Sequence, residues 1–208
     1  MSSPEDSTSL SFEQLLGWMG RFTPQFKFRL MTFRRVLPHA QFDSLVRDSL
    51  GVFRRVMVEL ARTPKGIDRA RRVYAMIDQE FQATPPKNVS CGEGCGACCR
   101  FPKQITDDEA DLLASLVLAG QAKIHPASLE KGGCPFLDGE NRCSVYNDRP
   151  STCRKYHVTS PRESCASDDG TVVPHIELMP EIIVSAAMSL PDNDIGMMND
   201  QLARRLQR

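Results

Sequence analysis

The stretch CGEGCGACCR, residues 91–100, decides the fold because it concentrates cysteines and glycines on one short loop. Cysteines spaced this closely can deliver several thiolates from one tight turn, without the entropic cost of closing a long loop. Glycines between them permit positive φ angles and let backbone N–H groups approach the sulfurs. The chain's eight cysteines all lie at or after residue 91: Cys91, Cys95, Cys98, Cys99, Cys134, Cys143, Cys153 and Cys165. We predict that all eight are metal ligands.

The adjacent pair Cys98-Cys99 indicates more than one metal atom, because neighbouring side chains diverge and do not readily bind a single ion. Eight thiolates are enough for two four-cysteine sites. A histidine could replace one of them, and His157, four residues after Cys153, is the best nitrogen candidate. A packed or solvated histidine is the more common alternative.

The identity of the cofactor stays open, because zinc and iron–sulfur clusters both accept thiolate ligands. Cys91, Cys95 and Cys98 have the spacing with which radical S-adenosylmethionine enzymes hold a [4Fe–4S] cluster. The 208-residue chain ends 110 residues after Cys98, too few for the usual barrel of those enzymes. The spacing is therefore compatible with a cluster but does not indicate that family.

The expected compartment is the cytoplasm. The N-terminal sequence MSSPEDSTSL has neither the basic nor the apolar region of a secretory signal. The longest apolar runs, residues 112–119 and 182–188, fall short of the ~20 residues of a membrane-spanning helix. Because the cytoplasm keeps thiols reduced, the cysteines indicate metal or redox chemistry rather than disulfides.

Residues 83–90, ATPPKNVS, divide the chain, because paired prolines cannot continue a helix. We predict a mainly α fold, with an N-terminal helical bundle and a small irregular α+β cysteine-rich metal-binding domain. The expected parts are a disordered tail, a helical domain, a cysteine-cluster domain and a C-terminal tail or short helix, at residues 1–10, 11–85, 86–190 and 191–208.

Apolar residues at helical spacing predict helices over residues 25–37, 42–62 and 66–82, after a first helix capped by Ser11 and Gln14. Thr106 and Glu109 form another capping box, before a helix that ends at Gly120. In the rest of the chain we expect a hairpin, a turn into a short helix, an edge strand and a last helix, at residues 134–146, 147–157, 171–178 and 180–190.

The formal charge is zero overall but unevenly distributed. Residues 1–88 have 14 basic and 9 acidic residues, whereas residues 89–208 have 12 and 17. Arginine pairs such as Arg54-Arg55 are expected to be solvated, and we predict binding to neither nucleic acid nor membrane. Eight of the ten phenylalanines precede the linker and are expected to fill a helical core. Part of that aromatic surface could instead bind a protein partner.

The cysteine segments resemble the CxxCxxCC family of zinc- or iron-chelating cysteine-cluster proteins. The matching features are CGEGCGACCR, then CPFL, a cysteine before Val-Tyr, an Arg-Pro pair and Cys-Arg with an aromatic residue close behind, over roughly residues 89–165. The first gap, between Cys91 and Cys95, holds three residues where the family's name has two. Similar domains occur in flagellin lysine N-methylases, so the resemblance leaves enzymatic activity open.

The resemblance implies a metal-binding domain whose ligands are the first seven cysteines, and Cys165 is added from the count alone. Arg149 and Arg154 are expected to donate hydrogen bonds to loop carbonyls, and binding of an anionic substrate is the alternative. Tyr156 lies close to both in the sequence. Phe136 and Tyr146 are expected to form a small core behind the site.

Three hypotheses for function remain. The leading one is an iron–sulfur cluster or multinuclear zinc/iron centre, with a redox or cluster-dependent role. The second is a structural zinc module whose helices bind a protein partner. The third, direct thiol redox chemistry at Cys95/Cys98 or Cys98/Cys99, lacks the thioredoxin-like sequence context. No GxSxG, HExxH or Walker motif is present, so no catalytic residue is assigned.

Overall fold

The computed structural model describes residues 24–125, 133–166, 174–175 and 177–207. Within these ranges the chain is mainly helical, with two short two-stranded sheets, and this confirms the predicted fold class. The predicted tail 1–10 and the helix capped by Ser11 and Gln14 lie outside the described residues. Among the described residues, every helix is too short or too polar to cross a membrane.

The first three described helices are α2 (Pro24–Val36), α3 (His39–Arg62) and α4 (Ile67–Ala83). Pro24 occupies the first helical position of α2, where a proline lacks no needed hydrogen bond. α4 ends where Thr84 precedes the paired prolines. These helices confirm the predicted ones, with boundaries shifted by at most three residues.

The helix α5 (Asp107–Leu118) begins with the capping box predicted from Thr106 and Glu109. The Glu109 N–H donates to the Thr106 hydroxyl over 3.4 Å, and the Thr106 N–H donates to the Glu109 carboxylate over 2.9 Å. The box satisfies two N–H groups that a helix start leaves without partners.

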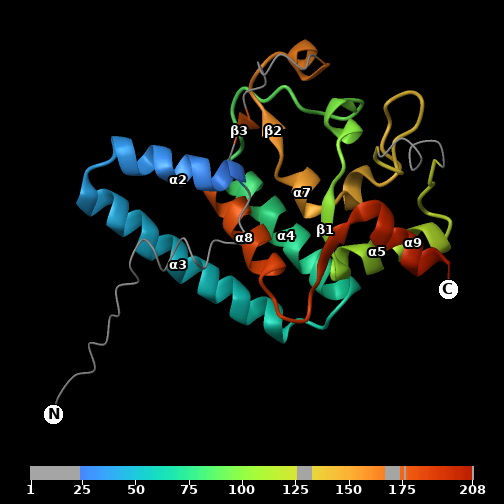
Figure 1. Ribbon diagram of the computed structural model, residues 1–208, viewed down its shortest axis with the longest axis horizontal. Helices are drawn as coiled ribbons and strands as arrows, with labels where there is room; N and C mark the ends of the chain where they lie inside the picture. Colours follow the sequence, from blue (N-terminus) through green and yellow to red (C-terminus); the bar gives the residue numbers. More distant parts are fainter. Residues whose placement is uncertain (1–23, 126–132, 167–173, 176, 208) are drawn as a thin grey trace.

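The helix α8 (Leu178–Met188) lies against both α3 and α4 (Figure 1). Its residues from Pro180 to Met188 are all buried, as expected for a helix that is mostly apolar and whose one carboxylate, Glu181, has a buried partner. A C-terminal element therefore completes the packing of the N-terminal helices.

The hydrophobic core is one continuous cluster that extends across the linker between α4 and the cysteine loop. Its fully buried side chains come from α3, α4, α5, α8, α9 and the segments between them, and include Leu60, Ile77, Ile105, Leu113, Phe136, Ile183 and Leu202. A smaller cluster of Leu30, Phe42 and Val46 packs α2 against α3. The division near residue 85 stays a prediction about folding units.

Two short antiparallel sheets connect distant segments. β1 (Gln104–Thr106) pairs with β4 (Ile195–Met197), and β2 (His157–Val158) pairs with β3 (Pro174–His175). β3 contains Pro174 and lies within the predicted edge strand. After β4 comes α9 (Met198–Leu206), which contacts α5, so residues 191–208 include the predicted short helix.

A buried ion pair links α4 to the start of α5. The Arg69 Nε donates to Asp108 Oδ2 over 2.5 Å, and the two side chains are only 3% and 2% exposed. Asp108 also accepts from the Gly66 N–H over 2.7 Å. Removing one partner of such a pair leaves an uncompensated buried charge.

We therefore expect Asp108→Ala to lower the free energy of unfolding by about 3–5 kcal/mol. The control is Asp111→Ala, because Asp111 pairs with Arg205 but is 41% exposed. That change should cost about 1 kcal/mol or less. Urea unfolding at fixed metal content measures both, and equal losses would contradict the role assigned to the buried pair.

Candidate metal centre

The cysteine loop begins with two hydrogen bonds to β2. The Ser90 N–H donates to the Val158 carbonyl over 2.8 Å, and the Val158 N–H donates to the Cys91 sulfur over 3.3 Å. A donor N–H at the sulfur stabilises negative charge there, as is common around metal-bound thiolates. β2 thus positions Cys91 although 67 residues separate it from Val158.

The middle of the loop is a tight turn. Gly94 has a φ of 80°, which other residues rarely adopt, and the Cys95 N–H donates to the Gly92 carbonyl over 3.1 Å. A short 3₁₀ helix, η2 (Ala97–Arg100), follows and carries Cys98 and Cys99.

The predicted hairpin brings Cys134 and Cys143 to this turn. Leu137 and Cys143 form a single antiparallel bridge, and the Asp138 carboxylate accepts the N–H groups of Glu140 and Arg142 over 2.9 and 2.8 Å. The Cys134 N–H donates to the Cys99 carbonyl over 2.8 Å. The hairpin is confirmed in a short form and is tied directly to the double cysteine.

Gly96 allows the hairpin to approach the turn closely. A Cβ atom at Gly96 would lie 2.7 Å from Asn141 Oδ1 and 3.1 Å from Leu137 Cδ2, both closer than normal contact. The buried glycine therefore contributes to the packing of the loop as well as to its shape.

Cys153 lies on α7 (Ser151–Arg154), the short helix predicted after Arg149-Pro150. The Ser151 N–H donates to the Glu109 carboxylate over 2.6 Å, so Glu109 holds the start of both α5 and α7.

Arg154 Nη1 donates to both oxygens of Asp78 on α4 over 2.8 Å. Lys155 Nζ donates to Glu181 on α8 over 2.6 Å, and both side chains are buried. Charged contacts thus fix α7 to three core helices.

These elements surround a cavity of about 100 Å³. Seven of the eight predicted ligands line it, together with His157: Cys91, Cys95, Cys98, Cys99, Cys134, Cys143 and Cys153. Cys165, on η4 (Arg162–Ala166), is not part of the lining. Its carbonyl accepts from Arg100 Nη2 over 2.9 Å, which places η4 beside η2. In Figure 1 the segment between α4 and β1, drawn in green, lies above α7, which itself carries Cys153.

The thiols surround the cavity without meeting at one point. Within the described ranges, no group of three or more His, Cys, Asp or Glu side chains is arranged closely enough to hold a metal ion. Cys98 donates a hydrogen bond to Cys99, and Cys99 donates to Cys134. All eight cysteines are free thiols rather than disulfides.

The pKa values of these thiols favour the protonated form when metal is absent. Donation to Cys134, together with burial, raises the pKa of Cys99 from 9.0 to about 12. Burial raises the pKa of Cys153 to about 12, and donation to Cys99 raises that of Cys98 further still. Burial also raises the pKa values of Cys91 and Cys143. Metal binding must therefore displace protons.

The chemistry of the donors fits zinc or iron. Thiolates are soft ligands that suit zinc and iron–sulfur clusters, and one imidazole is compatible with either. Among the described residues, the lining has a single histidine and no Asp or Glu, so the cavity differs from the oxygen-rich sites of calcium and magnesium.

Comparison with known families agrees with this chemistry. Residues 90–173 match the CxxCxxCC family, described as a "Putative zinc- or iron-chelating domain". No curated protein and no solved structure matches the chain. The match confirms the resemblance identified from the motifs, and the CxxCxxCC domain contains every cysteine of the chain.

Other side chains of the CxxCxxCC domain have mainly structural contacts. Arg154 stacks over the Tyr74 ring at 4.7 Å in addition to pairing with Asp78. Arg149 lines the cavity, donates to the Tyr146 carbonyl over 3.2 Å and lies 4.3 Å from the Tyr146 ring centre. These contacts agree with the expected role in holding loop carbonyls.

The expected core behind the site is only partly buried. Phe136 is fully buried, whereas Tyr146 is half-buried. Tyr156 lines the cavity and is 37% exposed. His157 lines the cavity beside Phe81, whose ring meets it edge-on at 4.8 Å, and its role as a ligand stays a prediction.

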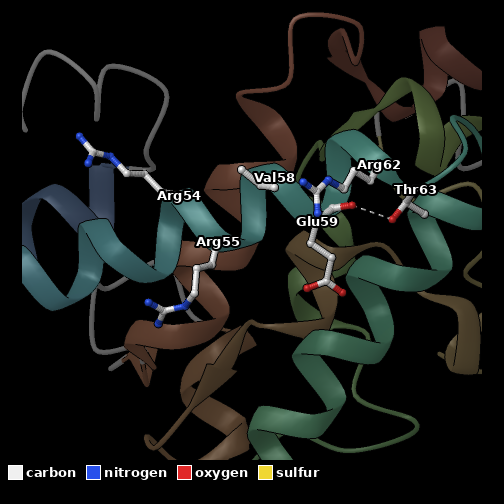
Figure 2. Close-up of a pocket in the computed structure, with 6 residues that line it drawn as sticks. All are labelled: Arg54, Arg55, Val58, Glu59, Arg62 and Thr63. Atoms are coloured by element: carbon white, nitrogen blue, oxygen red, sulfur yellow. Dashed lines mark hydrogen bonds between the residues drawn. The ribbon is translucent and has the colours of Figure 1, made fainter.

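A second hollow, of about 640 Å³, lies on α3, and its lining residues differ in chemistry from those of the cysteine site. Figure 2 shows its lining residues, with Arg54 and Arg55 pointing to opposite sides of the helix. Its carboxylate, Glu59, is paired with Arg72. The hollow has no thiol or imidazole in its lining and does not resemble a metal site.

Sequence reasoning missed two contributors to the site. Lys103 interacts electrostatically with Cys98 and Cys153, but an isolated lysine gives no pattern signal. Glu109 was recognised only as a helix cap, because its bond to the Ser151 N–H joins positions 42 residues apart. Spatial proximity of this kind has no local signature.

We expect Gly96→Ala to destabilise the metal-free protein by about 1–3 kcal/mol, because the new methyl group must displace Asn141 and Leu137. Metal affinity should fall as well, since the hairpin carries Cys134 and Cys143. Gly139→Ala is the control, because a Cβ there meets open space. Urea unfolding and metal titration of both variants measure the effect, and identical behaviour of the two would contradict it.

The raised thiol pKa values predict an alkaline loss of stability in metal-free protein. The folded state binds the Cys99 and Cys153 protons more tightly than the unfolded state, so this stabilisation is complete below pH 9 and declines toward pH 12. Unfolding free energies from about pH 8 to about pH 11 should therefore fall less steeply in Cys153→Ala. An unchanged slope would contradict the prediction.

Proposed function

We propose that the protein binds a multinuclear metal centre, an iron–sulfur cluster or a zinc/iron centre, through the cysteines of its CxxCxxCC domain. The eight cysteines are the proposed ligands, and His157 is the proposed replacement should one thiolate be absent. The observation that carries the proposal is that seven thiols line one cavity. A single tetrahedral ion uses only four such ligands.

The surroundings of the cavity support binding of anionic metal–thiolate centres. Each metal–thiolate group carries excess negative charge, and nearby cations reduce the energetic cost of burying it. The Lys103 ammonium interacts with Cys98 and Cys153, and the Arg149 guanidinium interacts with Cys143. On binding, the thiol side chains would turn toward the metal as they lose their protons.

The metal would determine the chemistry that the site supplies. An iron–sulfur cluster would supply electron transfer, whereas zinc would supply free energy for ordering the loops. The polypeptide's contribution is to position the thiols, to bury them partly and to place N–H donors and cations around them. Thiolates of this kind persist in a reducing compartment, and we propose the cytoplasm.

The second candidate function is a structural zinc module whose helices bind a protein partner. The observation in favour is the solvent-facing side of α3, where Arg54, Arg55 and Arg62 surround Val58, which is 51% exposed. Such a surface suits an acidic protein segment. On this hypothesis the metal orders the loops, and α3 makes the contact.

The proposal is tested on anaerobically purified protein. We measure its content of metal and acid-labile sulfide and record a visible absorption spectrum of the same sample. We expect more than one metal atom per chain. Iron with sulfide and a brown colour would identify a cluster. Colourless protein with more than one zinc per chain and no sulfide would identify a zinc centre, whereas a single zinc per chain would support the second candidate.

Two results would contradict the proposed function. Purified protein without bound metal, even after anaerobic reconstitution, would remove the metal centre altogether. A single metal atom per chain would leave metal binding intact but overturn the multinuclear centre. Arg54→Ala, on α3 and far along the chain from every cysteine, is a control that should leave metal content unchanged.

A further inference from the structure

Three of the cysteines contact the hydrophobic core, and a fourth, Cys153, lies on the anchored helix α7. Cys134 is buried within the core cluster, and Cys99 and Cys143 pack against it. Cys99 donates to Cys134 and interacts electrostatically with Cys153, which in turn interacts with Cys143. We call Cys99, Cys134, Cys143 and Cys153 the inner group. Displacement of any of these thiols disturbs either core packing or the anchored helix α7.

The other four cysteines are absent from the core cluster: Cys91 and Cys95 lie on the loop, Cys98 on η2 and Cys165 on η4. Cys91 interacts electrostatically with Cys95, Cys98 and Cys165. We call Cys91, Cys95, Cys98 and Cys165 the outer group. Between Cys91 and Cys95 the backbone is open to solvent, because Glu93 and Gly94 are exposed and a Cβ at Gly94 would meet nothing within 4 Å.

The two groups meet at the double cysteine. Cys98 lies three positions after Cys95, a spacing that one turn delivers to a common point, whereas the side chain of Cys99 is hydrogen-bonded toward Cys134. Cys98 also interacts with Cys143 and Cys153, so it marks the boundary between the groups.

We infer that the centre contains two metal positions of unequal lability: a closed, structural position held by the inner group and an exchangeable position held by the outer group. This inference rests on the proposed function. Structural metal sites are closed by protein ligands and contribute to folding, whereas accessible sites exchange ligands with solvent. Each thiol that binds the metal releases its proton to solvent. When a chelator takes up zinc or iron(II), solvent protons return to the thiolates and nothing is oxidised or reduced.

The difference in lability predicts release of metal in two phases. We expect a colorimetric chelator, pyridylazoresorcinol for zinc or ferrozine for iron, to remove metal from the native holoprotein at two rates that differ about tenfold or more. Circular dichroism should stay constant during the fast phase and change during the slow one. Anaerobic stopped-flow and manual mixing experiments measure both signals on the same sample.

Variants of the outer group test which cysteines give rise to the fast phase of metal release, and we expect these variants to fold. Cys95→Ser and Cys165→Ser should each abolish the fast phase and retain the slow one. Cys165 is the sharper test, because it is the one predicted ligand that does not line the cavity. Glu93→Gln, on the same exposed loop, is the matched control and should retain both phases.

The outcomes separate this inference from the proposed function. Holoprotein that releases all its metal in one phase, or a Cys165→Ser variant with both phases intact, would overturn the division into two positions while leaving metal binding established. Purified protein that contains no metal would instead overturn the proposed function itself.

Discussion

The carboxylate of Glu109 joins the helical core to the cysteine site. It accepts the Thr106 N–H at the start of α5 and the Ser151 N–H at the start of α7, and the side chain is 2% exposed. A buried carboxylate is costly unless several donors satisfy it, and these two helix starts supply them. Because Cys153 lies on α7, the carboxylate that caps α5 also helps to position the helix that carries one thiol of the proposed centre.

Much of the fold could be predicted because its signals are local. The capping box at Thr106, the proline that begins α2 and the paired prolines after α4 each act within a few residues. The burial of α8 between α3 and α4 could not be predicted, since an apolar helix gives no indication of which partners it packs against. The pairing of Gln104 with Met197 could not be predicted either, because a three-residue strand is too short to show an alternation of apolar and polar residues.

The candidate site likewise combines features that local sequence predicts with features that depend on long-range packing. Spacing alone indicated that Cys95, Cys98 and Cys99 share one turn, and the motif match supports the domain around them. The contact of Cys91 with Val158 and the approach of Asn141 to Gly96 depend on tertiary packing. The chemistry of the ligand candidates can therefore be predicted from the sequence. The distribution of the thiols between the core and the solvent-exposed loop cannot.

The arrangement makes the core and the cysteine loops depend on each other. Residues flanking Cys153 reach three core helices, through Glu109, Asp78 and Glu181, so α7 is held before any metal arrives. Among the described residues, the turn that carries Cys91 and Cys95 is held by hydrogen bonds to β2 and within itself rather than by ion pairs to the core helices. Preorganised ligands lose little entropy on binding, whereas loop ligands must be ordered by the metal. The contacts to the core are therefore concentrated at α7, and in the proposed arrangement an ion that enters from solvent would meet the less anchored cysteines first.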